Sequence, residues 1–131
     1  MLGRLSPNRF GVPRVKDEWA QHFTELASEY WTEERTQQLT RGKQLLILPG
    51  EAPVLLRSLG LLHRDASMPP NQVRKYLQIN HMLWVLRPAL RELMERFETL
   101  HFIDAGCGRS YLTVVLAWCL KHVWEHPARI L

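Results

Sequence analysis

Hydrophobic residues recur at helical spacing over much of this chain. The spacing predicts helices over residues 15–30, 72–86 and 89–97, and another from residue 111 onward. In the last of these the apolar stripe consists of Leu112, Val115, Leu116, Cys119, Leu120 and Val123. We expect Asn71 to cap the helix over residues 72–86, and Pro88 to end or kink it.

Shorter patterns fill the intervals between these helices. Residues 31–39 continue the first helix or form a second one capped by Thr32, and residues 53–59 predict a short helix between Pro53 and Gly60. The apolar run over residues 45–48 is compatible with a helix end or a strand. Residues 100–103 are typical of a short buried strand, and residues 128–131 resemble the beginning of a second one.

The segment Asp104-Ala105-Gly106-Cys107-Gly108 joins the predicted strand to the last helix. Its two glycines allow positive φ angles and leave no Cβ in the way of a ligand. The free N–H groups at the start of the following helix favour a carboxylate or phosphate. A dinucleotide fingerprint would require a third glycine where Tyr stands, and a P-loop would require a following Lys, so neither motif is present.

This strand, acid, glycine turn and helix resemble motif I of the class I S-adenosylmethionine-dependent methyltransferases, whose usual form is D/E-x-G-x-G-x-G. Ser110 replaces the third glycine of that motif. The resemblance implies S-adenosyl-L-methionine as cofactor, with the loop around its methionine and adenosyl parts. It also implies that residues 104–108 contact this cofactor.

The preceding helix carries Lys75-Tyr-Leu-Gln78-Ile-Asn-His81, which is similar to a pattern before motif I in a subgroup of methyltransferases. In such enzymes this helix often covers the methionine end of the cofactor. Lys75, Gln78 and His81 follow one another at i, i+3 and i+6, roughly on one side of a helix. We therefore expect these three residues to bind the cofactor; in the alternative, Lys75 is solvated and His81 is a boundary residue.

The fold class predicted from these elements is α/β, although most of the chain is helical. A flexible basic arm over residues 1–14 precedes a helical region over residues 15–98, and residues 99–131 begin a Rossmann-like, S-adenosylmethionine-binding domain. A complete doubly wound sheet needs roughly 200 residues. Only 31 residues follow Leu100. We therefore expect the rest of a methyltransferase domain as a partner of this segment.

Composition narrows the cellular location and the class of molecule that would accept a methyl group. The 131 residues are 46% hydrophobic and 23% charged, as in ordinary globular proteins, and no apolar run approaches a membrane span. Two cysteines give no disulfide framework, which favours a cytoplasmic location. The net charge of +4 favours anionic partners, so RNA is the acceptor class that we expect.

Two other classes of function compete with methyl transfer. His122, Glu125 and His126 fit the H-x-x-E-H pattern of some zinc proteases, but Pro127 interrupts the helix that would hold them. We assign no metal and no catalytic residue. The other alternative is a non-catalytic helical module, for protein interaction or nucleic-acid binding, that retains a vestigial cofactor loop.

Overall fold

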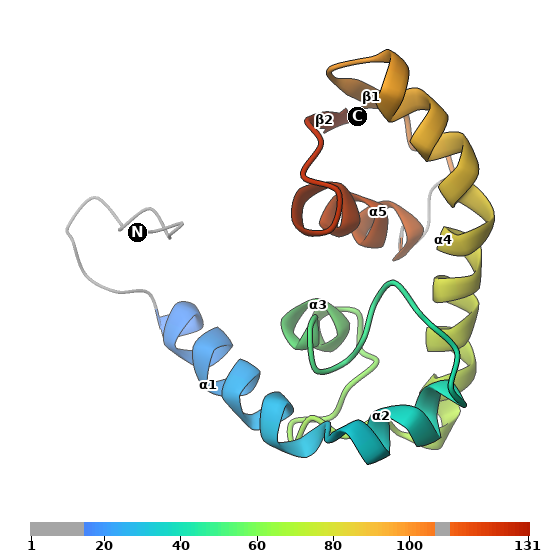
Figure 1. Ribbon diagram of the computed structural model, residues 1–131. Coiled ribbons are helices and arrows are strands. Elements are labelled where there is room, and N and C mark those ends of the chain that lie inside the picture. Colours follow the sequence, from blue (N-terminus) through green and yellow to red (C-terminus); the bar gives the residue numbers. More distant parts are fainter. Residues whose placement is uncertain (1–14, 107–110) are drawn as a thin grey trace.

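The computed structural model describes residues 15–106 and 111–131. Its elements, shown in Figure 1, are α1 (Val15–Tyr30), α2 (Glu33–Thr40), α3 (Pro53–Ser58), α4 (Pro70–Arg96), β1 (Leu100–Phe102), α5 (Tyr111–His122) and β2 (Ala128–Ile130). The chain is mostly helical with one small parallel sheet, as expected. No helix in the described ranges combines the length and apolar character of a membrane span. The predicted arm over residues 1–14, and Cys107, Gly108 and Ser110 of the motif, lie outside the described residues.

The longest helix, α4, corrects two predictions. It begins at Pro70 without a side-chain cap, so Asn71 is not its N-cap, and it runs unbroken through Pro88 to Arg96. The proline ring fixes φ at a helical value, and the ring costs one backbone hydrogen bond to the residue four positions earlier. Apolar residues on both sides of Pro88, Leu83 and Leu90, are buried, and this burial keeps the two predicted helices in one continuous element.

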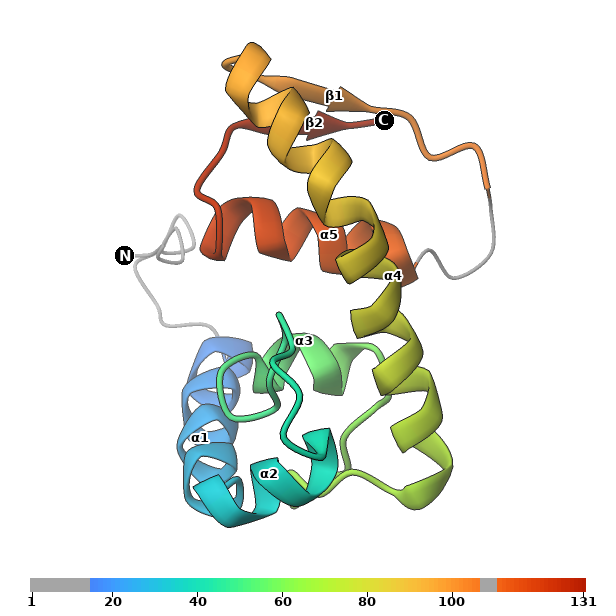
Figure 2. The ribbon, with the colours of Figure 1, turned by 45° about the vertical axis from the view of Figure 1, so that its right-hand side comes forward.

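Helix α4 runs from the N-terminal helices at its start to the sheet at its end (Figures 1 and 2). The larger of two hydrophobic clusters lies along its first half. It joins α1, α3 and the loops between them to α5 through Phe23, Ala27, Ile47, Ala52, Leu55, Leu56, Leu61, Leu62, Ala66, Tyr76, Ile79, Leu83, Val115 and Cys119. Helix α5 is therefore part of the same core as the helices that precede it.

The apolar run over residues 45–48 is neither helix nor strand. Ile47 is fully buried, and side chains of α4 bind its backbone. Its N–H donates to Asn80 Oδ1 at 3.0 Å, and its carbonyl accepts from the Tyr76 hydroxyl at 2.6 Å. These two bonds replace the partners that a regular element would supply, because buried backbone groups without partners are costly.

The sheet consists of β1 and β2 in parallel, with Leu100 opposite Ala128 and Phe102 opposite Ile130. Helix α5 connects the two strands and lies beneath them in Figure 2. The smaller hydrophobic cluster, formed by Leu90, Leu100, Leu116 and Leu120, fills the space between α4, α5 and β1. This cluster fixes the exit of β1 relative to the start of α5, where the motif lies.

Candidate functional site

The candidate site lies at the carboxyl end of the two parallel strands. Beyond the regular ladder, the Leu131 N–H donates to the Phe102 carbonyl at 2.9 Å and the Asp104 N–H donates to the Leu131 carbonyl at 3.1 Å. Asp104 is therefore held at the strand exit by the backbone of the neighbouring strand. In open parallel sheets this edge is where ligands bind.

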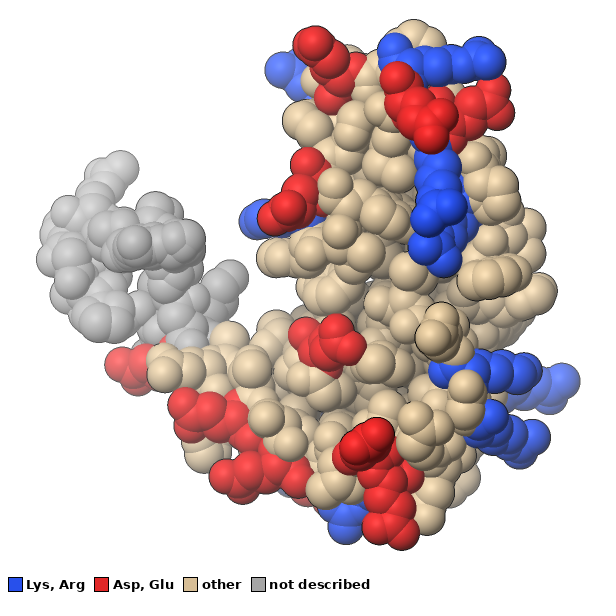
Figure 3. Space-filling model, viewed as in Figure 1, with Lys and Arg blue, Asp and Glu red and all other residues tan. Residues whose placement is uncertain are grey.

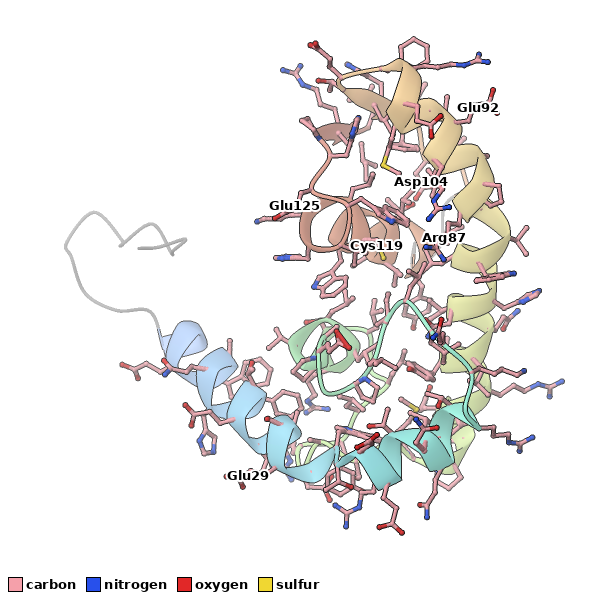
Figure 4. All side chains as sticks on the ribbon, viewed as in Figure 1. Glu29, Arg87, Glu92, Asp104, Cys119 and Glu125 are labelled. Atoms are coloured by element: carbon pink, nitrogen blue, oxygen red, sulfur yellow. The ribbon has the colours of Figure 1, made fainter. Side chains whose placement is uncertain are left out.

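The Asp104 carboxylate connects the two ends of the motif loop. Its Oδ1 accepts a hydrogen bond from the Gly106 N–H at 3.0 Å, and its Oδ2 accepts one from the Thr113 hydroxyl at 2.5 Å. The first bond closes a tight turn at the strand exit, and the second reaches the first turn of α5. Asp104 is labelled in Figure 4.

Gly106 corrects one expectation about the motif. Its φ angle lies outside the positive range, which among the described glycines is adopted by Gly42 and Gly60. A Cβ added at Gly106 would meet Asp104 Oδ1 at 3.5 Å, an ordinary contact. The protein conformation alone therefore does not require glycine here.

A groove of about 320 Å³ opens beside this turn. Its walls come from the end of β1, the motif segment, the first turns of α5 and β2. The lining residues are Phe102, Ile103, Asp104, Ala105, Gly106, Leu112, Thr113, Leu116 and Ile130. The groove is apolar apart from the Asp104 and Thr113 side chains, and its volume is at the small end of the range for small-molecule sites.

Lys75 lies next to the start of α5. Its ammonium nitrogen is 4.2 Å from the centroid of the Tyr111 ring, a cation–π contact between α4 and the first residue of α5. The Lys75 side chain is half-buried rather than fully solvated. The structure thus places a positive charge beside the helix that follows the motif loop.

Gln78 and His81 face other surroundings. Gln78 is exposed, and His81 lines a separate hollow together with Trp84 and the segment over residues 43–46. Steps of three and six residues turn a helix by about 60° and 120° away from the starting side, so the three side chains spread around α4. The structure does not bring Gln78 and His81 together with Lys75.

The alternative zinc pattern does not form a site. Helix α5 ends at His122, and Glu125 has a φ of 48°, so the two histidines do not share a helical face. His126 Nε2 lies 2.8 Å from the Phe97 carbonyl, a hydrogen bond that ties the end of α4 to the connection before β2. Within residues 15–106 and 111–131, no group of three His, Cys, Asp or Glu side chains could hold a metal ion.

Two residues of the site were missed by sequence reasoning. Thr113 and Tyr111 lie in the first turn of α5, where the sequence was interpreted only as an apolar stripe. Thr113 is a polar residue in an otherwise apolar stretch of this helix, and that is the signal that could have found it. Nothing in the sequence pairs Tyr111 with Lys75, because that contact depends on how α4 packs on α5.

Comparison with protein families matches residues 74–131 to a family described as a methyltransferase domain. The matched segment includes nearly all of α4, the motif and both strands, and it confirms the resemblance to methyltransferases. Comparisons with curated proteins and with solved structures found no match.

Proposed function

Since residues 74–131 match a methyltransferase domain, we propose that this segment binds S-adenosylmethionine in the groove beside Asp104 and presents its methyl group to an acceptor. The cofactor class follows from the class I resemblance of residues 104–108, whose third glycine is replaced by Ser110. A Rossmann-like arrangement is part of the same proposal, since two parallel strands joined by a helix are its smallest unit.

The observation that carries the proposal is the set of bonds around the Asp104 carboxylate. One oxygen binds Gly106 and the other binds Thr113, so the carboxylate joins the strand exit to the first turn of α5. A turn whose shape is fixed before the ligand arrives loses less entropy on binding. Gly106 is exposed, so the turn at the strand exit leaves its backbone open to a ligand.

The residues of the groove suit an amphipathic nucleoside. Apolar walls from Phe102, Leu112 and Ile130 can cover the adenosyl part. Lys75, which lies beside Tyr111 and outside the lining of the groove, provides a positive charge for the cofactor's carboxylate. We assign Asp104, Ala105 and Gly106 to cofactor binding together with Lys75. Cys107 and Gly108, outside the described residues, belong to the same proposed loop; Gln78 and His81 keep only the support of the sequence pattern.

When bound, the cofactor supplies a methyl carbon on a positively charged sulfur, which an acceptor lone pair attacks as the carbon–sulfur bond breaks and its electrons stay on sulfur. The chain's own residues bind the cofactor and orient it. The apolar walls of the groove contact the cofactor, and the Asp104 bonds hold the strand exit against the first turn of α5. No general acid or base is assigned.

Calorimetric titration with S-adenosylmethionine and with S-adenosylhomocysteine tests the proposal. We expect a dissociation constant on the order of micromolar for both, and a loss of about 10-fold or more in Asp104→Asn and Thr113→Val. The Asn variant keeps the shape of the carboxylate but not its charge, and the Val variant removes only the hydroxyl bond.

Two matched variants serve as controls. Glu98→Gln removes one exposed acid just before β1, and Thr24→Val removes a threonine hydroxyl that binds within α1. Both should bind the cofactors like the unchanged chain. Absence of binding at millimolar cofactor would overturn the proposal and favour the helical-module alternative, as would equal losses in the controls.

A further inference from the structure

A second surface, with aromatic and basic side chains, lies along the other side of α4. We call it the α4 strip and define it by Lys43, His81, Trp84, Arg87 and Arg91. Two hollows meet at Trp84: one of about 510 Å³, which Lys43 and His81 line, and one of about 690 Å³, which Arg87 and Arg91 line. From His81 to Arg91 the strip spans about 15 Å along the helix axis.

Trp84 is the central feature of the strip. It is 59% exposed, which is unusual for so large an apolar side chain. Its ring is not part of either hydrophobic cluster of the described residues. An exposed aromatic face between two hollows can stack on a planar base.

Arg87 flanks this ring. Its guanidinium carbon is 6.0 Å from the Trp84 ring centroid, and the side chain is half-buried. Among the described residues, the buried Nε of Arg87 has no hydrogen-bond partner. The covered stem and the neighbouring ring restrict this side chain, so its charge is presented at the hollow with less entropy to lose on binding.

The charge distribution also distinguishes this side of the molecule. Figure 3 shows acidic side chains gathered over α1 and α2, and basic side chains along α4 that are joined by acidic ones at the end of this helix. Helix α4 contains five Lys and Arg residues against two Glu. Both acids line the same hollow as Arg87 and Arg91, and Glu92 is paired with Arg96 at 2.9 Å. With Glu92 paired to Arg96, the two arginines of this hollow exceed its other acid, Glu95, by one positive charge.

We propose that the α4 strip binds a single-stranded nucleic acid, with a base stacked on Trp84 and phosphates at Lys43, Arg87 and Arg91. An aromatic platform between cations is the arrangement by which proteins hold single strands without base-specific hydrogen bonds. This inference rests on the proposed function, because the bound nucleic acid would be the acceptor of the methyl group. The binding itself does not depend on the cofactor.

Fluorescence anisotropy with labelled ten-nucleotide oligouridine RNA and oligothymidine DNA tests this surface. Three phosphate contacts predict that log K falls with log salt with a slope of about −2. Trp84→Leu should weaken binding by about 10-fold or more. The double variant Arg87→Gln/Arg91→Gln should reduce the steepness of the slope by about 1.4. Tighter binding of one oligonucleotide would identify the acceptor as RNA or as DNA.

The matched control is Arg64→Gln/Arg74→Gln, which removes the same charge from two exposed positions outside both hollows and outside the Glu92–Arg96 pair. This control should bind nearly as well as the unchanged chain. Equal losses in the two double variants would overturn the inference, because general charge would then explain the binding. Since Trp84 and Arg91 are exposed, Trp84→Leu and Arg91→Gln keep the test valid if the half-buried Arg87 does not tolerate substitution.

Two further outcomes separate this inference from the proposed function. Cofactor binding without binding of either oligonucleotide overturns only the α4 strip. Oligonucleotide binding without cofactor binding overturns only the methyl-transfer proposal. If Trp84→Leu instead changes the sedimentation of the chain and oligonucleotides do not bind, the strip is a protein interface and the inference is wrong.

Discussion

The ammonium of Lys75 lies 4.2 Å from the centre of the Tyr111 ring, which joins the first turns of α4 to the start of α5. Between these residues the chain passes through the rest of α4, β1 and the motif loop. The contact therefore helps to hold the start of α5 against α4.

Replacement of Lys75 by Met should distinguish the two parts of the cofactor. We expect S-adenosylhomocysteine, which carries a carboxylate, to bind about 10-fold more weakly, because its charged partner is lost. Binding of 5′-methylthioadenosine, which lacks the carboxylate, should not change. Calorimetry measures both, and Arg74→Met, at an exposed neighbour, is the control. Equal losses for both ligands would show that Lys75 acts through its packing on Tyr111.

Substitutions at Tyr76 and Asn80 should destabilise the protein without a change in charge. Asn80→Ala leaves the buried Ile47 N–H without a partner, and the free energy of unfolding should fall by about 2 kcal/mol. Tyr76→Phe loses the hydroxyl bond to the Ile47 carbonyl and should cost about 1 kcal/mol. Urea unfolding measures both, and Ser58→Ala, an exposed position in α3, should change the value by less than about 0.5 kcal/mol.

Pro88→Ala should stabilise the chain. Alanine restores the backbone N–H and removes the ring contact with the preceding turn, for a gain of about 1–3 kcal/mol in the free energy of unfolding. Thermal and urea unfolding of the two proteins measure this gain. A loss of stability would instead show that the backbone conformation set by Pro88 is needed for the packing of α4 on α5 and β1.

Cys119 should make the free energy of unfolding fall measurably at alkaline pH. Burial raises the pKa of its thiol from 9.0 to about 11, so the folded state retains the proton that the unfolded state loses. The stability from this group is fully present below pH 9 and is lost as the pH rises through about 11, by up to about 3 kcal/mol. Figure 4 labels Cys119 on α5.

Unfolding of Cys119→Ala between pH 8 and pH 11 isolates that contribution. The variant starts less stable because it leaves a cavity, but the difference from the unchanged chain should narrow as the pH rises. A difference that is constant over this range would contradict the raised pKa of the thiol.

The sequence by itself determined α1, the strand β1 and the helix α5 that follows it. The apolar period over residues 15–30 predicted α1, and the four buried residues of α5, Val115, Leu116, Cys119 and Leu120, all belong to the predicted stripe. Such patterns are local, because a helix or strand repeats its buried side every few residues. Asp104 at the exit of β1 followed from the same reasoning, and the family match confirms the methyltransferase resemblance.

Only the tertiary structure decided how these elements contact one another. Continuity of α4 through Pro88 depends on burial against α5 and β1, and the irregular segment around Ile47 depends on Tyr76 and Asn80. The separation of Lys75 from His81 follows from the side of α4 that each residue occupies. The Thr113 bond to Asp104 likewise joins residues brought together by the fold. These contacts leave no periodic signal, because each depends on the packing of distant segments rather than on local spacing.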